Sequence, residues 1–276
     1  MNKIGVLSII RRNLKNWFSI AMRLELQSLG LMRSERKIRI VFRSGEVFVS
    51  DSYYIARRII DYYYFSHKLG IYNLSEMEEI TNLSSHIREK LEKEFDEDMG
   101  YVSSFTANRI ALYCLIRKNE PETIIETGVA QGISSFLFLK AIDCNGKGML
   151  ISIDLPNRNP AGYQYAGITD RVYLPLDKEP GWLVPKDLRK SWKLMIGKSS
   201  EVLPKLGNCD LFYHDSEHSY KNMTMEYEWA YQHLSSGGII GSDDITWNNA
   251  WIDFLSNHKD LHPFLDDITL GIAVKK

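Results

Sequence analysis

Hydrophobic positions change their spacing along this chain of 276 residues near residue 123. Before that point, apolar residues recur mostly every three or four positions, which predicts helices at residues 51–69, 75–98 and 103–118. Residues 37–50 differ, because apolar and polar residues alternate there about Ser44-Gly45 and predict a β-hairpin. The first part of the chain is therefore expected to be rich in helices, with one hairpin.

After residue 123, short apolar runs alternate with helical patterns. The runs predict strands at residues 123–126, 148–154, 192–197, 210–214 and 238–242, and residues 264–275 predict one or two closing strands. Repeated strand–helix units favour a mainly parallel sheet covered on both faces. We therefore predict an α/β fold with a Rossmann-like, doubly wound, seven-stranded sheet at 104–276. Residues 1–103 would form an α-rich N-terminal appendage that contains the hairpin and serves substrate selection or oligomerisation.

The first forty residues are basic, with nine Lys or Arg residues and two acidic ones. Apolar residues at helical spacing, from Leu7 to Leu24, predict an amphipathic helix with a basic opposite face. Such a helix is compatible with a peripheral membrane contact. The favoured alternative is a helix packed on the main domain or on a second subunit, which makes a homodimer plausible.

Composition excludes several classes of protein. A net charge of −1 does not favour a nucleic-acid binder, and no apolar run reaches the length of a membrane span. The three cysteines are scattered without metal-like spacing, which is typical of free thiols in a reducing compartment. We expect a cytoplasmic protein.

The segment TIIETGVAQGISSFLFL, residues 123–139, predicts a strand, a tight loop and a helix. Its spacing is E-x-G-x-A-x-G, which differs from the G-x-G-x-x-G of dinucleotide enzymes and from a P-loop. A carboxylate at the strand end, Glu126, suits a ligand with a positive charge or hydroxyl donors, and S-adenosylmethionine (SAM) is such a ligand. A strand–helix turn without a ligand is the alternative.

Acidic residues follow the later strands as well. Asp154 ends the strand at 148–154, where doubly wound folds bind ribose hydroxyls, in NAD and SAM alike. Asp215 and the pair Asp243-Asp244 end two further strands, so three carboxylates are expected at one sheet edge. Their repulsion favours a hard divalent cation, Mg²⁺, over the simpler interpretation of turn and helix-capping residues.

His218 lies three residues after Asp215 and is expected over the same edge. A neutral imidazole suits a general base near pH 7. His214 and Glu217 are alternatives for that role, and a polar residue at a helix start is the structural alternative for His218. The proline-rich connection at 155–191 lacks clear periodicity and is expected to overhang the site as a substrate-binding loop.

Five segments in series resemble class I SAM-dependent methyltransferases: IIETGVAQGISS, LISID, MIGKSSEVLPKL, CDLFYHDSEHSY and GGIIGSDDI. They are most similar to the metal-dependent small-molecule O-methyltransferases of the catechol O-methyltransferase type. Closer still is the methyltransferase group of cephalosporin biosynthesis and macrolide sugars. The resemblance covers residues 104–275. Two positions depart from the catechol type, since His218 stands where those enzymes carry a Lys base and Asp244 where they carry Asn.

The resemblance implies roles for individual residues. The methionine end of SAM would be surrounded by Glu126, Gly128, Ala130, Gly132 and Ser134. Asp154 would bind the ribose, and Ser199 and Ser200 would lie beside the adenine. Asp215, Asp243 and Asp244 would hold Mg²⁺, with Asp215 and His218 as the catalytic residues. The expected activity is O-methylation of a small-molecule or sugar hydroxyl. The alternatives are an NAD(P)-dependent oxidoreductase and a non-catalytic binding protein of the same fold.

Overall fold

The computed structural model describes residues 27–28, 38–41, 47–50, 53–95, 107–165, 168–170, 172–266 and 270–276. By internal packing the chain divides into two units, Met1–Ile60 and Asp61–Lys276. The predicted functional boundary between residues 103 and 104 stays a prediction. The predicted basic helix over 7–24 lies outside the described residues.

The first unit contains the hairpin that the alternating pattern predicts. Strands β2 (Ile38–Val41) and β3 (Val47–Ser50) pair antiparallel, with Ile38 opposite Ser50 and Val41 opposite Val47. A third strand, β1 (Gln27–Ser28), pairs with β2. The sequence did not indicate β1, because a strand of two residues is too short to show alternation. Helix α2 (Tyr53–Leu69) follows this sheet in the chain.

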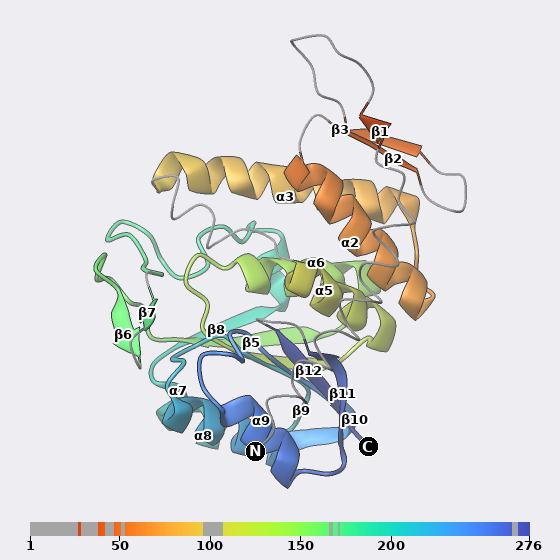
Figure 1. The fold of residues 1–276 in the computed structure, drawn as a ribbon. Coiled ribbons are helices and arrows are strands. Elements are labelled where there is room, and N and C mark those ends of the chain that lie inside the picture. Colours follow the sequence, from red (N-terminus) through yellow and green to blue (C-terminus); the bar gives the residue numbers. More distant parts are fainter. Residues whose placement is uncertain are drawn as a thin grey trace. The chain divides into compact units, whose positions relative to one another are not determined.

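The second unit contains a seven-stranded sheet in the order β11-β12-β10-β9-β4-β5-β8 (Figure 1). Its strands are β4 (Thr123–Thr127), β5 (Met149–Asp154), β8 (Trp192–Ile196), β9 (Cys209–His214), β10 (Leu234–Ser242), β11 (Leu261–Asp266) and β12 (Gly271–Lys275). Strands β8, β5, β4, β9 and β10 are parallel, whereas β12 runs antiparallel to both of its neighbours. The predicted Rossmann-like, mainly parallel sheet is confirmed.

Helices cover both faces of this sheet (Figure 1). Helices α5 (Ala107–Asn119) and α6 (Ile133–Asn145) lie on one face, and α7 (Ser199–Val202), α8 (Tyr220–His233) and α9 (Ala250–Asn257) lie on the other. The core beneath α8 and α9 is aromatic, with Phe212, Tyr227, Trp251 and Phe254 all buried. Helix α3 (Leu74–Glu94) adds a further layer, joined to α6 by an ion pair between Glu79 and Lys140. No helix in the described ranges has the length and apolar character needed to cross a bilayer.

The connection at 155–191 contains more structure than its sequence indicates. It forms a small antiparallel pair, β6 (Tyr163–Tyr165) and β7 (Ile168–Asp170), and a 3₁₀ turn at Leu188–Ser191. Part of it is bound to the loop after β4, because the Gly181 N–H donates to the Ala130 carbonyl at 2.8 Å. This docking places the connection against the candidate site.

Candidate active site

The carboxyl ends of four neighbouring strands, β5, β4, β9 and β10, are aligned at one edge of the sheet. The alignment continues past the strands through three backbone hydrogen bonds. The Gly128 N–H donates to Ile153 O at 2.8 Å, Asp215 N–H to Thr127 O at 2.8 Å, and Asp243 N–H to His214 O at 2.9 Å. Ligands of open α/β sheets bind at this edge. We call the two halves of this edge the β4–β5 side and the β9–β10 side.

The loop between β4 and α6 requires glycine for steric reasons. Gly128 has φ +84°, and a Cβ there would lie 1.8 Å from the Asp215 carbonyl oxygen. Gly132 has φ +89°, and a Cβ there would lie 2.6 Å from the Gly181 Cα. Between them Ala130 also has a positive φ, +45°, which is uncommon for a residue with a side chain. The loop is therefore compact and its backbone approaches both neighbours closely.

Asp154 holds this loop from the end of β5. Its Oδ1 accepts hydrogen bonds from the Val129 N–H at 2.8 Å and the Ala130 N–H at 3.3 Å. Burial raises the pKa of Asp154, although these two N–H donors oppose the shift. Its Oδ2 is buried and has no hydrogen-bond partner among the described residues. A buried acceptor without a partner at the rim of a glycine loop fits a ligand hydroxyl.

Glu126 lies beneath the loop and is fully buried. Its Oε2 accepts from Ser135 Oγ at 2.6 Å and from Ser152 Oγ at 2.7 Å, and Trp192 Nε1–H donates to Ser152 Oγ at 2.9 Å. Burial raises its pKa to about 6, although the serine hydroxyls oppose the shift. Ser134 is buried beside it. Glu126 therefore ties β4, β5 and α6 together, and its predicted contact with the methionine end of SAM stays a prediction.

Ser199 and Ser200 begin helix α7, after β8. Ser199 is half-buried, and its hydroxyl donates to Asn222 Oδ1 of α8 at 3.4 Å. Ser200 is exposed. Their predicted place beside the adenine stays a prediction.

The three acidic residues of the β9–β10 side are divided between two partners. Arg109, from the first turn of α5, places its Nη2 3.4 Å from Asp215 Oδ2 and 3.7 Å from Asp243 Oδ2. Asp244 instead approaches His218, with 3.9 Å between Asp244 Oδ2 and His218 Nε2. Burial and the neighbouring Asp243 raise the pKa of Asp215 well above its usual range, against the opposing charge of Arg109. The expected uncompensated cluster is thus corrected, because an arginine compensates two of its members.

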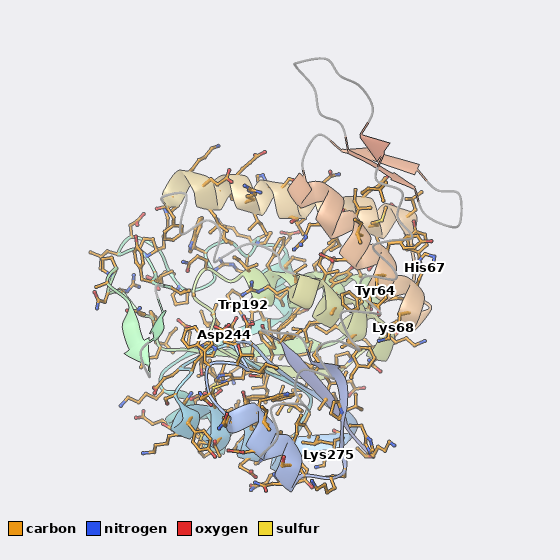
Figure 2. All side chains as sticks on the ribbon, in the orientation of Figure 1. Tyr64, His67, Lys68, Trp192, Asp244 and Lys275 are labelled. Atoms are coloured by element: carbon orange, nitrogen blue, oxygen red, sulfur yellow. The ribbon has the colours of Figure 1, made fainter. Side chains whose placement is uncertain are left out.

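Asp244 also has a positive φ, +50°. Figure 2 shows Asp244 at the carboxyl end of β10, whereas Lys275, near the end of antiparallel β12, lies at the opposite edge of the sheet. The turn after β10 is closed by the Trp247 N–H, which donates to Asp244 O at 3.0 Å, and it brings the Trp247 ring against His218.

His218 is 5% exposed, and neither ring nitrogen has a hydrogen-bond partner among the described residues. The ring packs against Trp247, with 4.8 Å between ring centroids, and against His214 at 5.2 Å. Burial and His214 lower the pKa of His218 to about 3, so the imidazole is neutral at pH 7. The nitrogens of this neutral ring are open to a ligand hydroxyl. A pKa of about 3 makes the ring a weak base, so proton transfer to it requires a carboxylate such as Asp244 to stabilise the imidazolium.

A buried carboxylate beneath this histidine was not predicted. Glu226 of α8 is fully buried, and its Oε2 contacts His214 Nδ1 at 2.6 Å and accepts from Thr127 Oγ1. Its Oε1 accepts from Ser216 Oγ at 2.8 Å and from Asn222 Nδ2 at 3.1 Å. Although burial opposes ionisation, His214 and the hydroxyls of Ser199 and Thr127 lower the pKa of Glu226 to about 2. The network fixes His214 and the start of the loop that carries Asp215.

Glu226 did leave a signal in the sequence. It shares a helical face with Met223, Tyr227 and Ala230, which are all buried. An acidic residue on an otherwise apolar helix face indicates a buried partner. Arg109 left no such signal in the sequence, because its partners lie more than a hundred residues away in the chain.

The structure brings most of the predicted site residues to one sheet edge: Gly128, Ala130, Gly132, Asp154, Asp215, His218, Asp243 and Asp244. Glu126 and Ser134 lie below the loop, and Ser199 and Ser200 lie at α7. This arrangement offers a glycine cradle with a buried acceptor on the β4–β5 side and a neutral imidazole beside carboxylates on the β9–β10 side.

Comparisons with known proteins agree with this fold. Residues 125–245 match a family model described as a methyltransferase domain. The SAH-bound methyltransferase PaMTH1 of Podospora anserina aligns with a TM-score of 0.50 and 13% identity, covering 74% of this chain and 97% of that one. The O-methyltransferase TomG of Streptomyces achromogenes, involved in tomaymycin synthesis and solved with SAM, gives a TM-score of 0.50 and 14% identity, covering 70% and 89%. At this identity the two structures support the fold. No curated protein matches the chain.

Proposed function

We propose that this chain, whose residues 125–245 match a methyltransferase domain model, is a class I SAM-dependent methyltransferase that methylates a hydroxyl oxygen of a small molecule or of a sugar or glycan. The observation that carries the proposal is the pairing of Asp154, with its buried unpartnered Oδ2, and His218, with its unpartnered ring, along four adjacent strand ends. One provides an acceptor for a ribose hydroxyl, and the other an acceptor for the proton of the substrate hydroxyl.

Methyl transfer forms an oxygen–carbon bond and breaks a carbon–sulfur bond. When bound, SAM supplies the electrophilic methyl group on a sulfonium centre. The glycine loop, which Asp154 holds in place, would bind SAM. Its backbone lies so close to the Asp215 carbonyl that no side chain fits at Gly128. On the β9–β10 side, a ring nitrogen of His218 takes the acceptor proton, and the Asp244 carboxylate at 3.9 Å stabilises the resulting imidazolium. Positioning the oxygen against the methyl carbon supplies much of the rate.

The residues assigned to Mg²⁺ from the sequence do not fit a metal as they stand. Among the described residues, no group of three His, Cys, Asp or Glu is arranged to hold a metal ion. Arg109 already contacts Asp215 and Asp243, and Asp244 is turned towards His218. The proposed reaction therefore contains no step through Mg²⁺.

Two alternatives give different cofactor binding. An NAD(P)-dependent oxidoreductase would require a different glycine loop, since E-x-G-x-A-x-G does not match the G-x-G-x-x-G pattern. A non-catalytic protein of the same fold would bind SAM without turnover. We further propose that residues 1–103 select the acceptor or form a homodimer, and that the protein acts in the cytoplasm.

The test is calorimetry with SAM, S-adenosylhomocysteine and NAD⁺, followed by transfer of a labelled methyl group from SAM to a panel of catechols and hexosides. We expect micromolar binding of SAM and S-adenosylhomocysteine, no binding of NAD⁺, and label in the hydroxyl-bearing acceptors. Binding of NAD⁺ alone would refute the proposed cofactor. SAM binding with no labelled acceptor in the panel would count against the proposed acceptor class.

A further inference from the structure

Asp215 and Asp243 follow neighbouring parallel strands, which brings two carboxylates into one small space. Both approach the same nitrogen atom, Arg109 Nη2, at 3.4 Å and 3.7 Å, so the two oxygens cannot be more than about 7 Å apart. Both side chains are only 20% exposed. Two like charges this close and this poorly hydrated require a counter-charge.

Arg109 supplies that charge from a firmly held position. It stands in the first turn of α5, and the residues that follow, including Ile110, Leu112 and Tyr113, are completely buried. The backbone of this helix therefore cannot move without disrupting the core. A cation near a helix N-terminus is disfavoured by the helix dipole, so the acidic pair, and not its own helix, accounts for this placement.

A divalent cation and this guanidinium would compete for the same oxygens. Mg²⁺ binds carboxylate oxygens at about 2.1 Å and prefers six ligands in near-ideal octahedral geometry. Bound between Asp215 and Asp243, it would lie within a few ångströms of Arg109, and the two positive charges would repel. The third acidic residue, Asp244, has its Oδ2 3.9 Å from His218 Nε2, and no three acidic, His or Cys residues in the described ranges are arranged to hold a metal ion.

We propose that Arg109 is the resident cation of this site and takes the place of a divalent metal between Asp215 and Asp243. The inference rests on the proposed function in one respect, namely that methyl transfer then proceeds without divalent metal. Arg109 acts as a positioning residue, because it fixes the two carboxylates that border the acceptor side. The binding of metal to the protein tests the assignment without any acceptor.

The experiment compares the wild-type protein with Arg109→Met and Arg117→Met. Methionine keeps an unbranched chain without charge. Arg117 is the matched control, because it lies on the same helix and its Nε makes an ion pair with Glu76 Oε1 at 2.7 Å, away from the strand ends. Binding of Mn²⁺ and Mg²⁺ is measured by electron paramagnetic resonance and calorimetry, with thermal unfolding to verify folding.

We expect no stoichiometric Mn²⁺ binding below 1 mM in the wild type or in Arg117→Met, and at least tenfold tighter binding of one ion in Arg109→Met. Arg109→Lys keeps a cation, so it should resemble the wild type, and it serves if the methionine variant does not fold. One tightly bound ion in the wild type that is lost in Asp215→Asn would overturn the proposal. A folded Arg109→Met that gains no ion would also overturn it.

Calorimetry with SAM on the same samples separates this proposal from the proposed function. Wild-type protein that binds neither SAM nor metal would refute the cofactor assignment and leave the assignment of Arg109 intact. With an acceptor from the panel, EDTA should change the rate of methyl transfer less than twofold. Abolition of transfer by EDTA would contradict metal independence.

Discussion

The carboxylates on the two sides of the strand-end edge are stabilised in different ways. On the β4–β5 side, Glu126 and Asp154 accept hydrogen bonds from neutral donors, namely serine hydroxyls and backbone N–H groups. On the β9–β10 side, Asp215 and Asp243 share the charged guanidinium of Arg109. The neutral donors hold the loop after β4 in one conformation and leave Asp154 Oδ2 available to a ligand. The ion pair concentrates charge on the side where we propose that the substrate is activated.

The largest effect is expected from breaking the β4–β5 cradle with Gly128→Ala. A Cβ at this position would lie 1.8 Å from the Asp215 carbonyl oxygen, on a backbone with φ +84°. The loop, which also contacts the other side of the edge, must then move. We expect the free energy of unfolding to fall by about 4 kcal/mol, and SAM binding to be lost, as measured by denaturant unfolding and calorimetry.

Gly146→Ala is the matched control. Gly146 also has a positive φ, +71°, at the end of α6, but a Cβ there would meet nothing within 4 Å. It should cost only about 1–2 kcal/mol, the penalty of the left-handed conformation, and SAM should still bind. Equal losses in the two variants would show that backbone strain, and not the close approach to Asp215, limits the loop.

The second prediction concerns the β9–β10 side. His218→Gln should lower kcat about 100-fold, because the ring takes the acceptor proton, while the Kd for SAM changes less than threefold. The rate of S-adenosylhomocysteine formation with an acceptor from the panel and calorimetry with SAM measure the two effects. His233→Gln is the control, since His233 ends α8 far from the strand ends and contacts Trp229 O through Nδ1 at 2.7 Å. If the Kd for SAM in His218→Gln rose as strongly as kcat fell, the β9–β10 side would also bind SAM, and the proposed division of roles between the two sides would be wrong.

The third prediction concerns the unpartnered oxygen of the cradle. In Asp154→Asn the amide oxygen can still accept from the Val129 and Ala130 N–H groups, but an NH₂ group replaces Oδ2. We expect the Kd for SAM to rise about tenfold with little loss of stability, because a charge-assisted hydrogen bond to the ribose is removed. Calorimetry and thermal unfolding measure the two quantities.

Asp210→Asn is the control for this change. The Oδ2 of Asp210 likewise accepts two backbone N–H groups, from Glu122 at 2.9 Å and Thr123 at 3.0 Å, but at the opposite edge of the same sheet. Its replacement should leave SAM affinity unchanged. A tenfold rise of the Kd for SAM in both variants would show that replacing any carboxylate that caps these strands weakens SAM binding, and that the position of Asp154 is not special.

The sequence predicted the β4–β5 side better than the β9–β10 side, for a physical reason. The hydrogen bonds from the Gly128 N–H to Ile153 O and from the Val129 N–H to Asp154 Oδ1 each join residues 25 positions apart, and strand–loop–helix spacing encodes such contacts. The positions of the main sheet strands and of the hairpin also followed from local patterns of apolar residues. The small strands β1, β6 and β7 were missed, because two or three residues carry no periodic signal.

The residue that supplies the counter-charge on the β9–β10 side lies far away in the sequence. Asp215 and Asp243 were expected to need a cation, and a metal ion was assigned because the converging carboxylates were taken to be uncompensated. Arg109 is 106 positions before Asp215, and only the packing of α5 on the sheet brings it there. A helical pattern fixes which face of α5 is apolar, but not which strand end its first turn meets.

The smallest effect, and the most direct test of the contrast, comes from Glu126→Gln. Burial raises the pKa of Glu126 to about 6 from an ordinary 4.5, so the folded protein binds this proton more tightly than the unfolded chain. Wild-type stability should therefore fall as the pH rises through this range, by about 1 kcal/mol between pH 5 and 7.5. Glutamine has no charge to bury, so the stability of the variant should not change with this titration. The stability of the variant relative to wild type should therefore rise by that amount as the pH increases from 5 to 7.5.

Glu226→Gln should show the opposite sign, because a histidine faces that carboxylate in addition to neutral donors. His214 and the hydrogen bonds lower the pKa of Glu226 to about 2, so its stabilisation is complete above pH 4.5 and is lost as the pH falls towards 2. This variant should be less stable than wild type at pH 7.5, with the difference shrinking below pH 4.5. Urea unfolding of both variants across this range measures the two slopes. If the slopes had the same sign, burial alone would govern both carboxylates, and the partner, neutral or charged, would not matter.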